Sequence, residues 1–413
     1  MSNWNNIQLG EIIEVKNGYA FKSKDFIEEG IPVIKIKNVK PNKILLDVLS
    51  YVSEDVAEGL DSYLIKPTDI LITMSGNRID GTPDSWVGKV ALFKKTGKFL
   101  LNQRVSIIRV NEQKASTAFI AYYLSSWQSQ LHLINQANSS GGQANISPDI
   151  IKDYEINLPP LEEQISIANI LNSIDNKVDL LQRQNVTLEK MADALYRQVF
   201  IEDADSSWEK DKLENVANVQ NGYAFSSKDY VPFQISHLEV LKMGHIERGG
   251  GLKANPKKDY VPRSDKLKKW ILNKGDIIMA MTDMKDNVVI LGVPAMIDKD
   301  DKYVLNQRVA RISLNESNRL TNIHLLYIQL KDSDFISTLQ SKANSGVQVN
   351  LSTEAIKESE IIIPPFDVQN NIGKTISALY TKKEKNDGQI QTLTKLRDTL
   401  LPKLMSGEIT VES

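Results

Sequence analysis

NGYAF stands at residues 17–21 and again at residues 221–225, and LNQRV stands at residues 101–105 and again at residues 305–309. The two copies of each block lie 204 residues apart. Four further blocks match in the same order at similar offsets: Trp4 and Leu9 with Trp208 and Leu213, DILI (69–72) with DIIM (276–279), SSGGQANIS (139–147) with NSGVQVNLS (344–352), and INLPPLEEQ (156–164) with IIIPPFDVQ (361–369). The chain is therefore a duplication with a unit of about 205 residues. This unit is far longer than the roughly 20–50 residues of a solenoid repeat, so each copy contains a domain.

The composition excludes several classes of protein. A chain of 413 residues with 41% hydrophobic and 25% charged residues is typical of two or three globular domains. Cysteine is absent, which excludes disulfides, thiolate zinc sites and cysteine nucleophiles. We expect a cytoplasmic protein without membrane contact, because no run of eighteen apolar residues and no basic-then-apolar start is present. The net charge of -2 argues against a non-specific nucleic-acid coat but allows local basic patches.

Each repeat begins with a stretch that predicts mixed α and β structure. Alternating apolar and β-branched residues at 31–36, 70–74 and 105–110 predict strands. Ser147-Pro148-Asp149 has the residue types of a helix start, and Ser352-Thr353-Glu354 stands at the matched place. We therefore expect an α+β domain in each repeat.

Each repeat ends with a long helical pattern. After Pro159-Pro160 no glycine or proline occurs until past residue 200, and apolar residues recur at steps of three and four. The pattern returns after Pro364-Pro365, with Gly388 and Pro402 weakening the helix. Each helix could pack on its own domain, or the two could pair as an antiparallel coiled coil.

Antiparallel pairing makes a specific prediction about register. Placing Asn185 opposite Asn386 fixes a constant sum of paired residue numbers and brings apolar residues together at five positions: Leu195 with Ile376, Ala192 with Leu379, Leu181 with Ile390, Val178 with Leu393, and Leu171 with Leu400. The weak points are Lys383 and Arg397, whose charged ends must reach water. A helix of about 39 residues spans roughly 58 Å, so DNA half-sites bound by the two domains would lie about one duplex turn apart.

The order of these blocks, W…L…NGYAF, DILI, LNQRV, GGQANIS and INLPPLEEQISIANIL, and its recurrence in the second half resemble the specificity subunits of type I restriction–modification systems. The resemblance covers the whole chain. It implies target recognition domains at 1–158 and 202–363, each reading one half of a split site in double-stranded DNA, and helical spacers at 159–201 and 364–413. It further implies docking of two methyltransferase subunits and of restriction/translocase subunits, with no cofactor or catalytic residue in this chain.

Two motifs resemble parts of catalytic or nucleotide-binding sites, but each lacks a residue that such a site needs. Gly373-Lys374-Thr375 imitates the end of a phosphate-binding loop, but Val368 stands where that loop needs a glycine. Leu158 and Ile363 precede the two Pro-Pro pairs, where amino-methyltransferases have an Asn or Asp. Two other functions remain as alternatives. One is a self-sufficient methyltransferase or nuclease, which would need a cofactor or metal motif. The other is a coiled-coil tethering protein, which would not explain the divergent polar loops.

Polar residues at strand ends are the candidates for contacts with DNA. In the first repeat these candidates are Lys35, Lys37, Asn38, Ser75, Asn77, Arg78, Ser140 and Gln143. In the second they are Lys242, His245, Thr282, Asp283, Lys285, Asn344 and Gln348. The loops differ between copies (SGNRID against TDMKDN), so we expect different half-sites, whereas the invariant Asn-Gln-Arg is either framework or a phosphate contact. The lysine-rich run 253–274 is either a solvated face or a phosphate track.

Overall fold

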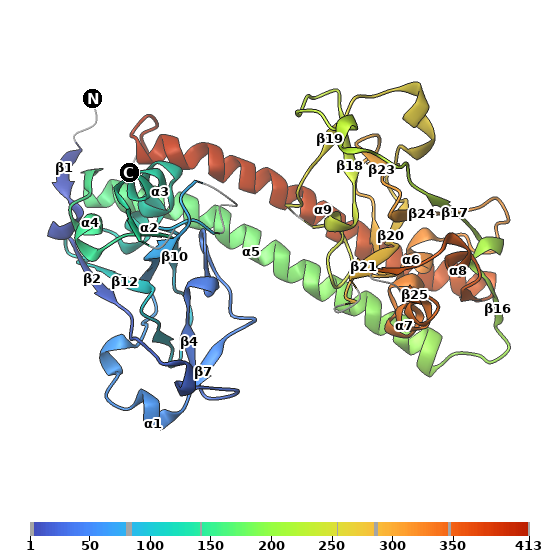
Figure 1. Ribbon diagram of the computed structural model, residues 1–413, viewed down its shortest axis with the longest axis horizontal. Coiled ribbons are helices and arrows are strands. Elements are labelled where there is room, and N and C mark those ends of the chain that lie inside the picture. Colours follow the sequence, from blue (N-terminus) through green and yellow to red (C-terminus); the bar gives the residue numbers. More distant parts are fainter. Residues whose placement is uncertain are drawn as a thin grey trace. The chain divides into compact units, whose positions relative to one another are not determined.

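The computed structural model describes residues 4–79, 85–140, 143–253, 255–284, 288–345 and 348–411. The chain forms two compact units, one of residues 1–180 with 390–413 and one of residues 181–389. Each unit is α+β, as the sequence predicted, and Figure 1 shows the labelled elements of both. Among the described residues, no helix is long and apolar enough to cross a membrane.

The first unit is built on an antiparallel four-stranded sheet of order β10-β8-β12-β2. Its strands are β10 (Val90–Leu92), β8 (Ile70–Thr73), β12 (Val105–Val110) and β2 (Ile13–Asn17). All four residues of the central β8 are buried, which agrees with its continuous apolar sequence. One core joins this sheet to the helices α2 (Thr117–Ser125), α3 (Trp127–Gln136) and α4 (Pro148–Lys152). Each helix starts at a capping serine, as predicted for Ser147: Ser116, Ser126 and Ser147.

A second sheet of order β11-β4-β7-β3 packs beside the first. Its strands are β11 (Leu100–Leu101), β4 (Ile31–Ile34), β7 (Ser50–Val52) and β3 (Phe26–Ile27), and β4 runs parallel to β11. Smaller elements complete the unit: β1 (Asn5–Gln8) with β15 (Glu155–Leu158), β5 (Val39–Lys40) with β6 (Lys43–Ile44), the sheet β13 (Asn138–Ser140), β14 (Gln143–Asn145) and β9 (Ser75–Gly76), and the short α1 (Glu54–Ala57).

The second unit repeats the central sheet, the small three-stranded sheet and the two-stranded pair of the first unit, which confirms the duplication, and its side sheet has three described strands instead of four. Its central sheet consists of β17 (Ala217–Asn221), β24 (Val309–Leu314), β20 (Ile277–Ala280) and β22 (Pro294–Met296). Beside it lie β19 (Tyr260–Val261), β18 (Leu238–Leu241) and β23 (Tyr303–Leu305), then β21 (Thr282–Met284), β26 (Gln348–Asn350) and β25 (Asn344–Ser345), and β16 (Glu209–Lys212) with β27 (Glu360–Ile363). The helices are α6 (Ile323–Lys331), α7 (Ser333–Ser341) and α8 (Thr353–Lys357).

Two long helices follow the globular parts, and each contributes residues to both units. They are α5 (Leu161–Arg197) and α9 (Phe366–Met405). In the first unit, Leu171 of α5 shares a core with Leu401 and Leu404 of α9. In the second unit, Ala192 and Tyr196 share a core with Ile376. Each long helix therefore packs both on a domain and against its counterpart, which combines the two arrangements that the sequence allowed.

The predicted asparagine pair and its register are confirmed within the second unit. Asn386 Nδ2 donates to Asn185 Oδ1 at 2.9 Å, and Asn386 is 0% exposed. Glu189 of α5 lies 3.5 Å from Lys383 of α9, so residue numbers rise along one helix as they fall along the other. The two helices are therefore antiparallel. Lys383 in the second unit and Arg397 in the first are the two charged residues of the seam. Both side chains form ion pairs with acidic residues.

The glycine of Gly373-Lys374-Thr375 lies inside α9 and has a packing role. A Cβ at Gly373 would lie 3.0 Å from Asn322 Nδ2, at the residue that caps α6. The small residue thus allows α9 to approach the start of α6. A helix interior has no free backbone N–H groups to surround a phosphate, which agrees with the rejection of a nucleotide-binding loop.

Candidate nucleic-acid interface

The two invariant motifs, NGYAF and LNQRV, contact each other in the first unit. A Cβ at Gly18 would lie 2.3 Å from the backbone oxygen of Asn102, so only glycine allows this approach. Tyr19 N–H donates to Leu101 O at 2.8 Å, and Gln103 N–H donates to Tyr19 O at 2.9 Å. The recurrence of both motifs therefore has a structural cause, because each is needed to hold the other.

The second unit has the same arrangement. A Cβ at Gly222 would lie 2.2 Å from the oxygen of Asn306. Tyr223 N–H donates to Leu305 O at 2.8 Å, and Gln307 N–H donates to Tyr223 O at 3.0 Å. We refer to residues 102–104 and 306–308 as the NQR turns.

Each NQR turn lies between the two kinds of loop that the sequence singled out. On one side, Asn102 N–H donates to Ile34 O at 3.0 Å, which places the turn beside Lys35 at the end of β4. On the other side, Met74 N–H donates to Arg104 O at 2.9 Å, immediately before β9. In the second unit Asn306 N–H donates to Leu241 O at 3.1 Å and Met281 N–H to Arg308 O at 3.0 Å. The fold thus gathers the candidate loops of each unit around one turn.

Asn38 supports the backbone of its own loop from a buried position, and its contact with DNA stays a prediction. Asn38 is 2% exposed, and its Oδ1 accepts from the backbone of Lys35 at 2.9 Å. Its Nδ2 donates to the backbone oxygens of Leu45 and Val48. Lys35 Nζ lies 3.3 Å from the centre of the Phe26 ring, and burial followed by the charge of Lys37 lowers the pKa of Lys35. Of the three predicted residues in this loop, Lys37 is the exposed one.

His245 is buried at the matched place of the second unit and supports its loop in the same way. It is 2% exposed, and its Nδ1 accepts from the backbone of Lys242 at 3.2 Å. Its Nε2 lies 3.2 Å from Glu239 Oε1. Lys242 Nζ lies 2.7 Å from Asp259 Oδ2 and 4.0 Å from the centre of the Tyr230 ring. The same lysine-on-aromatic contact therefore supports this loop in both units.

Arg78 is exposed and holds its loop against a helix. Its Nη1 donates to Ile134 O at 3.0 Å and its Nη2 to Ala137 O at 2.6 Å. These carbonyl groups lie at the C-terminal end of α3, where a cation is favoured.

The other candidates of the first unit differ in exposure. Ser75 is buried, and Asn77 is half-buried with its Nδ2 donating to Ser85 Oγ at 3.3 Å. Gln143 is exposed, and its Oε1 accepts from Arg104 Nη1 at 3.0 Å. The backbone of Ser140 lies in β13, and its side chain is outside the described part of the structure.

Asp283 organises the corresponding loop of the second unit from a buried position. It is 8% exposed, and its carboxylate accepts from the backbone N–H groups of Met284, Val289, Ile290 and Leu291. Burial raises its pKa, but these four hydrogen bonds together outweigh burial and leave the pKa lowered. Asp283 and Thr282 are both buried and support the backbone of this loop, and their contact with DNA stays a prediction.

The remaining candidates of the second unit are placed only in part. Asn344 and Gln348 lie in β25 and β26, and their side chains are outside the described part of the structure. Lys285 lies outside the described residues. Met284, which the sequence analysis did not select, is 62% exposed at the end of β21. An apolar side chain gives no signal for DNA contact in the sequence, although such side chains can contact the thymine methyl group.

The lysine-rich run 253–274 does not form a uniform cationic face. Arg263 Nη1 lies 2.6 Å from Asp301 Oδ1, and Lys268 Nζ lies 2.8 Å from Asp265 Oδ1. Lys266 and Lys269 lie over the aromatic rings of Tyr223 and Trp270. Ion pairs and ring contacts therefore engage part of this run, which reduces the charge available for a phosphate track.

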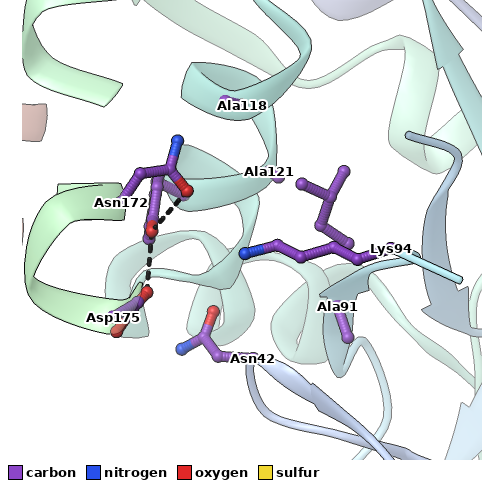
Figure 2. Close-up of a pocket in the computed structure, with 9 residues that line it drawn as sticks. Asn42, Ala91, Lys94, Ala118, Ala121, Asn172 and Asp175 are labelled. Carbon is purple, nitrogen blue, oxygen red and sulfur yellow. Dashed lines mark hydrogen bonds between the residues drawn. The ribbon is translucent and has the colours of Figure 1, made fainter. Parts of the chain in front are cut away.

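A small pocket lies between α2, β10 and α5 in the first unit (Figure 2). Its volume is about 40 Å³. A water molecule needs roughly 10–15 Å³ by this measure, so the pocket has room for a few waters and is too small for a nucleoside cofactor. Tyr122 OH donates to Asp175 Oδ2 at 2.7 Å on its wall, and burial followed by this hydrogen bond raises the pKa of Tyr122. Among the described residues, no group of three or more His, Asp or Glu side chains could hold a metal ion.

Two copies of one α+β frame, which present different loops at matched places, define a duplicated binding protein. A model of the type I restriction modification DNA specificity domain matches residues 1–190 and 205–395. The chain belongs to this family and is a specificity subunit of a type I restriction–modification system, which is the non-catalytic component of the enzyme complex.

The chain matches several curated relatives over most of their length. The chain is 23% identical to the type I restriction enzyme EcoBI specificity subunit of Escherichia coli, over 99% of this chain and 87% of the relative. It is 25% identical to the MjaVIII specificity subunit of Methanocaldococcus jannaschii, over 92% of this chain and 91% of the relative. The crystal structure of a type I restriction–modification system S subunit from M. genitalium has the same fold, with a TM-score of 0.61 and 17% identity. The match covers 100% of this chain and 97% of that one.

Proposed function

We propose that each unit reads one half of a split sequence in double-stranded DNA and that the chain brings methyltransferase and restriction/translocase subunits to that site. The observation that supports this proposal most directly is the combination of a repeated frame with different loops. The NQR turns and the strands around them match between the units, whereas the residues that follow β8 and β20 differ in sequence. Two readers with one frame and different loops suit two different half-sites.

The two loops also differ in chemistry. In the first unit the strand end presents Arg78 and, across the small sheet, Gln143, whose guanidinium and amide groups can donate to base edges. In the second unit the apolar Met284 stands at the place matched to Asn77 and is 62% exposed, while Lys285 stands at the place matched to Arg78. Guanidinium and amide groups favour purines, whereas an apolar side chain favours a thymine methyl group. We therefore expect the two half-sites to differ in sequence.

The proposed partners follow from membership of the family and from the resemblance over the whole chain. As a specificity subunit without a catalytic role, the chain needs other subunits to supply methyl transfer, DNA translocation and cleavage. We propose that the long helices α5 and α9 take part in docking two methyltransferase subunits. The assignment of residues 1–158 and 202–363 as the two target recognition domains is part of the same proposal.

A domain exchange tests the proposal. Residues 1–158 are replaced by the matched domain of another family member, and the methylated sites of a host carrying the whole operon are determined by methylome sequencing. We expect one half-site to change and the other to persist. A change in both half-sites would contradict the two-reader model. The purified chain without its partner subunits is expected to show no methyltransferase, ATPase or nuclease turnover, and reproducible turnover would favour the self-sufficient enzyme instead.

A further inference from the structure

The framework explains the backbone of the NQR turns but does not explain their arginines. Gly18, Tyr19 and the turn are joined through backbone atoms, and Met74 N–H contacts only the backbone oxygen of Arg104. Any residue could supply that oxygen. Arg104 and Arg308 are nevertheless identical in two units whose neighbouring loops differ, and both side chains are exposed. An exposed, unchanged side chain beside divergent loops indicates a ligand feature that both half-sites share.

The contact of Arg104 differs from that of a framework arginine in the same unit. Arg109 forms a two-point ion pair with Asp69, at 2.8 and 2.9 Å. Arg104 instead donates to the neutral amide oxygen of Gln143, at 3.0 Å. This contact does not neutralise the guanidinium, and it directs Arg104 toward the start of β14, where we expect Gln143 to contact bases.

A phosphate group is the DNA feature that every half-site shares. Phosphate contacts fix a protein on the duplex without conveying sequence, and a guanidinium can bind phosphate through two parallel hydrogen bonds. The chain has a net charge of -2, so its affinity for a polyanion requires cations concentrated where the DNA lies.

We propose that Arg104 and Arg308 each contact a DNA phosphate and position their unit on the duplex independently of base sequence. The proposal rests on the proposed function, and it assigns the unchanged turn to positioning and the divergent loops to base recognition. In this arrangement Arg104 keeps or gives up its hydrogen bond to Gln143 when DNA binds, and the start of β14 lies over the groove beside the phosphate.

Binding measurements at several salt concentrations test this assignment. The full-length chain, co-purified with its partner subunits, is titrated with two fluorescent duplexes, one containing the methylated site and one scrambled. For Arg104→Ala and for Arg308→Ala we expect affinity to fall about tenfold on both duplexes, because a hydrogen bond to a charged group is lost. The slope of log K against log salt should flatten by about 0.9 for each phosphate contact removed.

Two further variants control for charge and folding. Lys114→Ala removes another exposed positive charge, beyond the far end of β12, and should leave affinity unchanged. Arg104→Lys keeps the charge and should restore most of the salt slope while losing two-point binding.

The possible results distinguish this proposal from the proposed function. A loss confined to the specific duplex would make Arg104 a base reader and overturn the proposal, as would an effect no larger than that of Lys114→Ala. If the wild-type complex methylates a split site while neither arginine variant changes binding, the positioning role fails and the proposed function stands. If the wild-type complex shows no preference for any site, the proposed function fails.

Discussion

Gln164 in the first unit and Gln369 in the second make matching contacts at the start of the long helices. Gln164 Oε1 accepts from Ser116 N–H at 2.8 Å, and its Nε2 donates to Pro159 O at 2.7 Å. Gln369 makes the same two contacts with Thr321 and Pro364, at 3.1 and 2.9 Å. Each buried amide joins the start of a long helix to the start of α2 or α6. This explains why glutamine ends both copies of the Pro-Pro motif.

Arg78→Ala is expected to weaken recognition of the first half-site and also to lower stability. The side chain has two hydrogen bonds to the end of α3. Its loss should lower the free energy of unfolding by about 1–2 kcal/mol, which is less than for a buried charged group because Arg78 is exposed. Urea unfolding measures the loss of stability. Methylation of DNA substrates in which one half-site has been altered measures the loss of recognition. Weakening of the second half-site to the same extent would contradict the assignment.

Asp283→Asn gives a pH-dependent test of the loop in the second unit. The folded-state pKa of Asp283 is lowered, so its carboxylate contributes stability above pH 3.8, and this contribution is lost as the pH falls through the folded-state value. Asparagine keeps only one acceptor oxygen for four backbone donors, so we expect a cost of about 1–3 kcal/mol at pH 7. The difference from wild type should narrow below pH 4 in urea unfolding, and a constant difference would contradict the mechanism.

At the scale of elements, the long helices combine an apolar seam with one buried polar pair. The amides of Asn185 and Asn386 satisfy each other in part, and Asn185 Nδ2 also donates to Asp387 Oδ1 at 2.6 Å. Asn386 Oδ1 is buried without a hydrogen-bond partner among the described residues. A buried polar pair of this kind reduces stability but selects one register.

Replacing the asparagine pair should separate stability from register. Asn185→Leu and Asn386→Leu, made singly, each leave one buried amide without its partner and should cost about 1–3 kcal/mol in urea unfolding. The double variant should recover that loss, because leucine fits an apolar seam. Its register should become less specific, which crosslinking between engineered cysteines on α5 and α9 can detect. Two additive single losses would show that the amides do not interact.

At the scale of the whole molecule, the long helices are expected to set the spacer between half-sites. One heptad of seven residues is inserted after Asn185 and another before Asn386, so that the asparagine pair and the apolar seam are kept. Seven residues add about 10 Å of helix, which corresponds to about three base pairs. Methylome sequencing should show a longer non-specific spacer and unchanged half-site sequences. An unchanged spacer length would refute this role for the helices.

The repeats and the periodic segments could be predicted because their signals are local. Matched blocks revealed the duplication, short runs of apolar and β-branched residues revealed the buried strands, and steps of three and four residues revealed α5 and α9. The register of the helices followed as well, because each seam contains one asparagine and burying one without the other would leave an amide unsatisfied. Each of these features depends on residues close together in the sequence or on a repeat of the sequence itself.

The surroundings of the described loop residues were decided only by tertiary structure. Arg78 finds its partner 56 residues away at Ile134, and Asn38 and His245 become buried where their loops fold back on the domain. A polar residue at a strand end looks the same in the sequence whether it faces solvent or supports a turn. What distinguishes the two cases is which distant carbonyl or carboxylate the fold brings within hydrogen-bonding distance, and local residue patterns do not contain that information.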